Sequence, residues 1–385
     1  MLKILIDATP LAPKPSGVGL YVANLIHFLL SQQTRESFQL GIIYQPGLKT
    51  WLRGRLDIPD FLEQYSNCHL LPIPVRISNV LLDYFPSLFS IYLEDSVNSI
   101  DIVHGTNYTV FPYRQPLKVM TIYDLTCVKY PQYINSVVKT YFKRIKHCLQ
   151  WTDIVLTISE SAKQDIVDYL KVKPERIWIT PLASRYSGKD EGIAPLEHPQ
   201  VAYDFSRPYL LFVSTLEPRK NIIAIVEAFN YLKGNYKIEH QLVLIGQKGW
   251  KYKPILSAIA HSHWHEEIYH LDYLSDSYVA WFYKQADVFV YPSHYEGFGL
   301  PVLEAMTLGA PVVTSNTSSL PEVAGDAALL IDPNDPMELA EAILKVISDS
   351  QFRQDLIQKG KARAKLFSWE RTAQETLNAY KSLLS

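Results

Sequence analysis

The chain has 385 residues, of which 48% are hydrophobic and 20% are charged. Single hydrophobic cores stop growing at about 250–300 residues, so this length predicts two domains, and the composition excludes a disordered or collagen-like chain. A formal net charge of −2 leaves no basic field to hold nucleic acid by counterion release, so no nucleic-acid partner is expected.

The cysteines and the apolar segments bear on the compartment. Cys68, Cys127 and Cys148 are scattered and odd in number, which predicts neither a disulfide framework nor a C-x-x-C metal site and fits a reducing compartment. No apolar stretch reaches about 18 residues without a charge, so no transmembrane helix is expected. The opening MLKILIDATP lacks the basic and long apolar regions of a signal peptide, and we interpret it as a first strand. The sequence thus predicts a soluble cytoplasmic protein.

Short apolar runs alternate with helical patterns through the first half of the chain. Val/Ile-rich runs that are bounded by polar turns and followed by helices are typical of parallel sheets covered on both faces. The strand-like runs lie at 2–9, 38–44, 101–106, 117–123 and 153–159, the helical patterns lie at 17–31, near 135–150 and at 160–171, and the series closes at 176–182.

The polar stretch 183–207 contains Gly and Pro and lacks periodicity, so it is expected to be an interdomain linker. Strands and helices then alternate again, with a helix from about Asn221 and the strand runs PYLLFVST, HQLVLIG, IYHLDYL, DVFVYPS, APVVTSN and AALLID. The last segment, 351–385, is helical and has no strand after it. The pattern predicts two doubly wound α/β domains, 1–182 and 208–369, with ligands in a cleft between them.

The strongest motif is YPSHYEGFGLPVLEAMTLGAPVV, in which a strand runs into a Gly-containing turn and then into a helix from about Leu300. Glycines let backbone amides approach a ligand, and a helix N-terminus favours an anion such as a diphosphate. Glu296 on the turn and Glu304 in the helix could both face the same site. The alternative is that Glu304 only complements the helix dipole and that Glu296 is an ordinary loop residue.

A second motif, STLEPRKN, follows the strand PYLLFV and precedes a helix. It places Arg219 and Lys220 where a phosphate would lie, since Arg binds phosphate through two hydrogen bonds and Lys acts as a point charge. The alternative is a solvated basic pair, although a helix start disfavours positive charge.

Weaker signals lie in the first half. PSGVGLY, which contains Gly17, carries Gly-x-Gly without the full dinucleotide fingerprint, so NAD is not favoured, but a phosphate or a sugar could approach this turn. His104, Tyr123 and Asp124 lie at strand ends, where catalytic groups collect in such sheets. A purely structural histidine is the alternative for His104.

One segment of the sequence is a candidate for metal binding and another for membrane contact. HSHWH lacks a carboxylate or Cys partner at ligand spacing, and no Asp-x-Asp occurs, so no metal site is expected. The segment 139–147 interleaves basic and aromatic residues and could lie on an anionic membrane surface, with a solvated face as the alternative.

Taken together, the motifs resemble those of the retaining glycosyltransferases of family four, which have the GT-B fold. The resemblance is carried by DATPL, SGVGLYVANL, DIVHGTN, TIYDL, TDIVLTISESAKQDI, STLEPRKN, LIGQKGW, EGFGLPVLEAMTLGAPVV and SLPEVAGDAALLIDP, in this order. It covers nearly the whole chain, is densest in the second half and favours the mannosyltransferase-like branch.

The resemblance implies a metal-independent enzyme whose second domain binds a nucleoside-diphosphate sugar. Arg219 and Lys220 would neutralise the diphosphate, Glu296 would contact the transferred sugar, and the first domain would bind the acceptor, with His104, Tyr123 and Asp124 as candidates. The donor-binding set would be Gly17, Tyr273, Leu274, Phe298, Gly299, Leu300 and Glu304. A final helix at about 370–385 would return to the first domain. Many family members have His in place of Tyr123, which leaves a polar role at that position open.

The implied reaction moves a hexose from a GDP-hexose, or secondly from UDP-glucose, to a saccharide or lipid-linked saccharide. Polysaccharide or glycolipid synthesis at the cytoplasmic face of a membrane would be the setting. Two alternatives remain: an inactive scaffold that binds a sugar nucleotide, and a GT-B epimerase acting on a nucleotide sugar.

Overall fold

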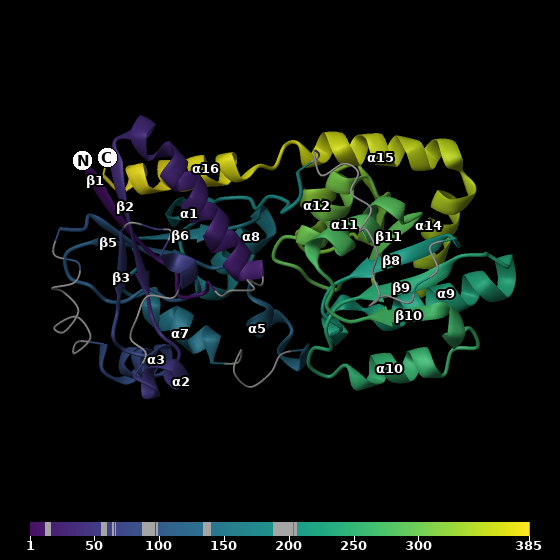
Figure 1. Ribbon diagram of the computed structural model, residues 1–385, viewed down its shortest axis with the longest axis horizontal. Helices are drawn as coiled ribbons and strands as arrows, with labels where there is room; N and C mark the ends of the chain where they lie inside the picture. Colours follow the sequence, from purple (N-terminus) through teal and green to yellow (C-terminus); the bar gives the residue numbers. More distant parts are fainter. Residues whose placement is uncertain are drawn as a thin grey trace. The chain divides into compact units, whose positions relative to one another are not determined.

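The computed structural model describes residues 1–11, 17–54, 60–63, 65, 67–86, 97, 99–133, 140–187, 203 and 206–384. The chain forms two compact units (Figure 1). Unit 1 comprises Met1–Lys129, Ser136–Leu182 and Trp369–Ser385, and unit 2 comprises Tyr130–Asn135 and Ala183–Ser368. Each unit is a doubly wound parallel sheet, which confirms the predicted fold class.

Unit 1 is built on a parallel sheet with the order β3-β2-β1-β4-β5-β6-β7. Two of its central strands, β4 and β6, are buried at every residue, as expected for strands covered by helices on each side. The strands are β1 (Leu2–Asp7), β2 (Phe38–Tyr44), β3 (Cys68–Leu70), β4 (Ile102–Gly105), β5 (Leu117–Thr121), β6 (Ile154–Thr157) and β7 (Ile177–Ile179). The helices are α1 (Gly17–Glu36), α2 (Leu48–Leu52), α3 (Val75–Tyr84), α5 (Thr126–Lys129), α7 (Tyr141–Cys148), α8 (Glu160–Leu170) and α16 (Trp369–Ser382).

Unit 2 has a parallel sheet with the order β10-β9-β8-β11-β12-β13. The strands are β8 (Tyr209–Val213), β9 (Gln241–Ile245), β10 (Ile268–Leu271), β11 (Val288–Tyr291), β12 (Val312–Ser315) and β13 (Ala328–Ile331). The helices are α9 (Ile222–Tyr236), α10 (Lys253–Ala260), α11 (Asp276–Gln285), α12 (Leu300–Leu308), α13 (Leu320–Ala324), α14 (Pro336–Ser348) and α15 (Ser350–Ala364).

The strand order reverses once in each sheet, between β1 and β4 in unit 1 and between β8 and β11 in unit 2. At such a point the two connecting loops leave toward opposite faces of the sheet, which opens a crevice beyond the carboxyl ends of the two strands. The segments that follow β1, β4, β8 and β11 are therefore placed to line ligand sites, one in each unit.

The structure refines the predicted boundaries. In the stretch 183–207, which the sequence predicts to be a linker, the described residues 183–187, 203 and 206–207 belong to unit 2, and 188–202 and 204–205 lie outside the described residues. The segment Tyr130–Asn135 also belongs to unit 2 although its chain neighbours belong to unit 1, which the sequence did not indicate.

The C-terminal helix α16 belongs to unit 1 and packs along α1, as the family resemblance implied (Figure 1). The Tyr380 hydroxyl lies 2.7 Å from Nδ1 of His104, whose Nε2 lies 2.7 Å from the Thr121 hydroxyl. His104 has no exposed surface, and burial lowers its pKa to about 3, so the ring is neutral. Nδ1 thus contacts the final helix and Nε2 contacts β5, so neither ring nitrogen is open in this structure to the acceptor that His104 is expected to contact.

Helix α7 covers most of the predicted basic segment, and Lys139 lies outside the described residues. Lys143 and Lys146 are exposed, whereas the Arg144 guanidinium turns to Asp83 at 3.4 Å. None of the helices within the described ranges combines the length and apolarity needed to cross a bilayer. Membrane contact through this segment stays a prediction.

We expect Tyr380→Phe to lower the free energy of unfolding by about 1–3 kcal/mol, because it leaves a buried imidazole nitrogen without its partner. Urea titration followed by circular dichroism would measure the loss. The control is Tyr169→Phe on α8, where the exposed hydroxyl should be worth less than about 0.5 kcal/mol. Equal effects of the two substitutions would contradict a docking role for His104 and Tyr380.

Candidate active site

The segments after β8 and β11 bring the strongest predicted residues together. A short 3₁₀ turn, Pro218–Lys220, follows β8 and holds Arg219 and Lys220, while the loop after β11 holds Glu296. Both strands are buried and parallel, so their carboxyl ends meet at one edge of the sheet. The sequence motifs STLEPRKN and YEGFG thus converge in space.

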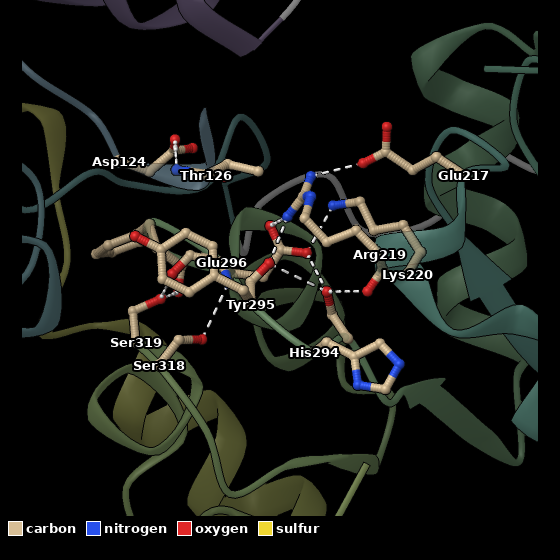
Figure 2. A network of polar contacts seen from close by, with 12 residues as sticks. Asp124, Thr126, Glu217, Arg219, Lys220, His294, Tyr295, Glu296, Ser318 and Ser319 are labelled. Carbon is tan, nitrogen blue, oxygen red and sulfur yellow. Dashed lines mark hydrogen bonds and ion pairs between the residues drawn. The ribbon is translucent and has the colours of Figure 1, made fainter. Parts of the chain in front are cut away.

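The Glu296 carboxylate is the centre of a dense polar network (Figure 2). Its Oε1 accepts hydrogen bonds from Lys220 Nζ at 2.6 Å, from the Ser293 hydroxyl at 2.7 Å and from the Tyr291 hydroxyl at 3.0 Å. Its Oε2 lies 2.8 Å from Arg219 Nη1. Only 8% of Glu296 is exposed, so this carboxylate is fixed by a complete set of partners rather than by water.

The two cations are held just as firmly. The Arg219 guanidinium lies between Glu296 and Glu217, with Nη2 at 2.7 Å from the Glu217 carboxylate, and it also donates to the Tyr295 carbonyl (Figure 2). Lys220 is 6% exposed and donates to the Tyr291 hydroxyl at 2.7 Å. Two carboxylates and two cations therefore form a charge-balanced buried cluster.

The pKa shifts follow from this arrangement. Burial by itself would raise the pKa of Glu296, but Arg219 and Lys220 outweigh burial and hold it at about 2. Burial and the neighbouring Arg219 lower the pKa of Lys220, which Glu296 opposes. Burial raises the pKa of Glu217, although Arg219 opposes this rise. Glu296 is thus an anion at neutral pH, and it compensates the charges of half-buried Arg219 and buried Lys220.

The glycine turn ahead of α12 has a conformation that demands glycine at one position. Gly299 has φ 112°, and a Cβ there would lie 2.8 Å from Cδ2 of Leu320. The Ser319 hydroxyl braces the turn, lying 2.9 Å from the Glu296 carbonyl oxygen and 2.7 Å from that of Phe298.

This turn leaves backbone amides at the N-terminus of α12 without a hydrogen-bond acceptor. Within the described residues, the amides of Phe298, Gly299 and Leu300 donate no hydrogen bond, whereas the next turn of helix begins regularly with the Val302 amide on the Gly299 carbonyl. Free amides at a helix start attract an anion.

Glu304 on α12 has a partner that the sequence did not reveal. Its carboxylate is 2% exposed and accepts a hydrogen bond from Arg185 Nε at 2.7 Å, and Arg185 Nη1 reaches Asp276 at 3.0 Å. Burial raises the pKa of Glu304, and Arg185 opposes that rise. Arg185 falls in the stretch that was expected to be a linker, where no local pattern distinguishes it.

The other predicted residues are placed as follows. Tyr273, which is 59% exposed, and Leu274 follow β10 in unit 2, and Gly17 is the first residue of α1 in unit 1. Tyr123 is buried and its hydroxyl donates to the Thr106 carbonyl, while the half-buried Asp124 accepts a hydrogen bond from a backbone amide. The described part of the chain contains no group of three His, Cys, Asp or Glu side chains placed to hold a metal.

Sequence reasoning missed Glu217, Tyr291 and Ser293, although each adjoins a predicted residue. Glu217 lies in the same motif as Arg219, and Tyr291 and Ser293 lie at the end of the strand motif DVFVYPS. A buried cation pair needs anions and hydrogen-bond partners. That requirement could have pointed to Glu217, while the hydroxyls depend on the loop geometry.

Solved glycosyltransferase structures share this architecture along the whole chain. Sucrose-phosphate synthase of Thermosynechococcus elongatus matches with a TM-score of 0.77 at 21% identity, over 100% of this chain and 99% of that chain. Anabaena HepE, solved with UDP and glucose, matches with a TM-score of 0.72 at 16% identity, over 99% and 100%. The two parallel-sheet units are those of the GT-B fold.

Sequence comparison defines the family. Residues 194–363 match the model of glycosyl transferases group 1. The O-antigen chain mannosyltransferase B of Escherichia coli is 36% identical over 99% of this chain and 100% of its own length. An MMP alpha-(1->4)-mannosyltransferase of Mycolicibacterium hassiacum is 28% identical over 60% of this chain and 54% of its own. The chain belongs to the group 1 glycosyltransferases, which confirms the resemblance seen in the motifs.

The pKa of Glu296 predicts a specific loss of stability in acid. A carboxyl whose pKa falls from 4.5 to about 2 on folding stabilises the folded state fully above about pH 5 and loses this contribution as the pH falls toward 2, a total of about 3 kcal/mol. The difference in unfolding free energy between the native protein and Glu296→Gln should therefore shrink below pH 5.

Chemical unfolding at pH 7, 5, 4 and 3.5 would measure this difference. Glu341→Gln, at an exposed position on α14, is the control and should leave the native profile unchanged. A constant difference between the native protein and Glu296→Gln across this range would refute the depressed pKa.

Proposed function

We propose that the chain is a retaining, metal-independent mannosyltransferase that uses GDP-mannose and extends a saccharide or lipid-linked saccharide in polysaccharide synthesis. The observation that carries this proposal is the pair of half-buried Arg219 and buried Lys220 at the strand-order reversal of unit 2, together with the free amides of α12. The choice of mannose rests on the printed activities of the relatives, and UDP-glucose is the second donor candidate.

The charge balance explains how a diphosphate would be accommodated. Without a ligand, Glu217 and Glu296 compensate Arg219 and Lys220, so no buried charge is left unpaired. A diphosphate adds negative charge, which the two cations and the N-terminus of α12 can meet together. Because the cations are already in position, little reorganisation is needed when charge develops on the departing diphosphate.

The same geometry argues against Glu296 as a nucleophile. Both of its oxygens are engaged by cations or hydroxyls, and a carboxylate with a pKa near 2 is a weak base. We therefore propose that the bond from C1 to the phosphate oxygen breaks first, with the electron pair leaving on the diphosphate. The acceptor hydroxyl then bonds to C1 from the same face, and its proton passes to the departing phosphate oxygen.

Glu304 is proposed to accept hydrogen bonds from the ribose hydroxyls of the donor. Arg185 occupies one of its oxygens, so a ribose would share Glu304 with Arg185 or replace it. Either arrangement keeps the buried carboxylate paired.

The two alternative functions are less well supported. An inactive scaffold would not need a complete charge cluster around Glu296, and an epimerase would need further acid–base groups at the sugar. The resemblance favours the cytoplasmic face of a membrane as the setting, with Lys143 and Lys146 as the exposed basic residues of the predicted membrane contact.

We expect Lys220→Ala to weaken GDP-mannose binding by thirtyfold or more, because truncating one member of a buried charge cluster costs about 2–5 kcal/mol. Titration calorimetry in the presence of EDTA would measure it. Lys253→Ala, at an exposed site on α10, should bind like the native protein. Binding that requires a divalent metal, or that survives Lys220→Ala, would contradict the proposed donor site.

The proposed course of the reaction predicts an α-linked mannoside and no covalent intermediate on the protein. Nuclear magnetic resonance of the product would give the anomeric configuration, and intact-protein mass spectrometry during turnover would reveal an adduct. A β-linked product, or a mannosyl group on Glu296, would exclude the mechanism.

A further inference from the structure

Helix α3 of unit 1 presents a row of exposed apolar side chains. Ile77, Val80 and Tyr84 recur at helical spacing on one face, with exposed fractions of 38%, 54% and 67%. Phe85, which follows the helix directly, is 54% exposed. No other helix or strand within the described ranges exposes more than two large apolar side chains. We infer that this row inserts into the interfacial layer of a membrane that contains anionic lipids, while the exposed cations around it bind the lipid headgroups.

The opposite face of α3 accounts for the packing of the helix. Leu82 has no exposed surface and belongs to the hydrophobic core of unit 1. The buried Ser78 hydroxyl accepts a hydrogen bond from Gln45 Nε2 at 2.6 Å. The exposed row is therefore not needed to hold the helix in place. Single exposed apolar residues are ordinary on a protein surface, whereas a contiguous row of them marks an interaction site.

Helix α7 supplies charge at the edge of this row rather than apolar surface. Its Tyr141 and Phe142 are half-buried, and Lys146 Nζ lies 4.5 Å from the centroid of the Phe142 ring. Lys143 is exposed like Lys146, and its Nζ lies 5.8 Å from the centroid of the Tyr84 ring on α3. The aromatic residues that the sequence interleaves with these lysines are thus partly covered, and the apolar part of the surface comes from α3.

Further exposed cations lie on both neighbours of the row. Lys49 and Arg53 lie on and just after α2, which packs against α3 (Figure 1), and Arg76 lies on α3 itself. Asp83 is the one acidic residue of α2, α3 and α7, and its carboxylate lies 3.4 Å from the Arg144 guanidinium. The surface around the row is therefore basic, and an anionic membrane attracts each of its cations.

A second copy of the chain fits this surface less well than a bilayer does. In a two-fold contact the same patch meets itself, so the cations of one copy would face those of the other, and like charges oppose association. Anionic headgroups neutralise these cations, while the layer beneath accepts apolar side chains. Tyr84 combines an apolar ring with a polar hydroxyl, which suits the level of the headgroups. The inference does not depend on the proposed transfer reaction, and it extends the predicted membrane contact of α7 to two further helices.

Vesicle flotation of the full chain, without donor, tests the inference. The probes are vesicles of phosphatidylcholine alone and of about three parts phosphatidylcholine to one part phosphatidylglycerol, in which the second lipid supplies negative charge. We expect the native protein to bind the mixed vesicles at least about tenfold more tightly than the neutral ones, because each cation near an anionic surface adds to the attraction. Lys143→Gln combined with Lys146→Gln should lower the affinity for mixed vesicles by about tenfold and leave that for neutral vesicles within about twofold.

The apolar row is tested by Val80→Ser combined with Tyr84→Ser. This pair should lower the affinity for mixed vesicles by at least about tenfold, since both side chains are removed from the interfacial layer. Ile223→Ser combined with Tyr236→Ser is the matched control, because it removes the same kind of exposed surface from α9, and it should bind within about twofold of native. Val80→Trp should add fluorescence that brominated acyl chains quench, whereas Ile223→Trp should not.

The inference is overturned if the native protein does not bind mixed vesicles, if the α3 and α9 pairs behave alike, or if Val80→Trp shows no added quenching. A dimer in sedimentation that the α3 pair dissociates would also overturn it, since a second copy would then cover the row. The affinity for GDP-mannose should match the native value in every variant of α3 and α7. Lys220→Ala should in turn bind vesicles like the native protein, so the transferase proposal and the membrane inference can fail independently.

Discussion

The compensation of buried charge around Glu296 is the constraint on which the rest of the candidate site depends. Buried Lys220 and half-buried Arg219 need anions beside them, because an unpaired buried ion costs several kcal/mol. Glu217 takes the far side of the guanidinium, and Glu296 supplies the anion between the two cations. The surrounding groups hold this one carboxylate in place: the hydroxyls of Tyr291 and Ser293 donate to it, and the Ser319 hydroxyl bonds to the turn that carries it. The site is thus preorganised for negative charge before any ligand arrives, which is where electrostatic catalysis gains most.

The topology explains where the candidate site of unit 2 lies. A parallel sheet collects the carboxyl ends of its strands at one edge, and the reversal of strand order opens a crevice there. In unit 2 the reversal lies at β8 and β11, whose following segments hold the charge cluster. In unit 1 it lies at β1 and β4, whose following segments line a cavity of about 310 Å³.

The sequence predicted the two doubly wound units and the convergence of Arg219, Lys220 and Glu296 because those features are local. Apolar runs mark buried strands, and charged residues directly after a strand must lie at its end. Pairing across the fold was not predictable in this way. Arg185 reaches Glu304 from 119 residues away, and no periodicity records such a contact. His104 illustrates the opposite difficulty. A residue at the end of a strand can face the protein interior or a ligand site, and in His104 the C-terminal helix α16 covers the side chain.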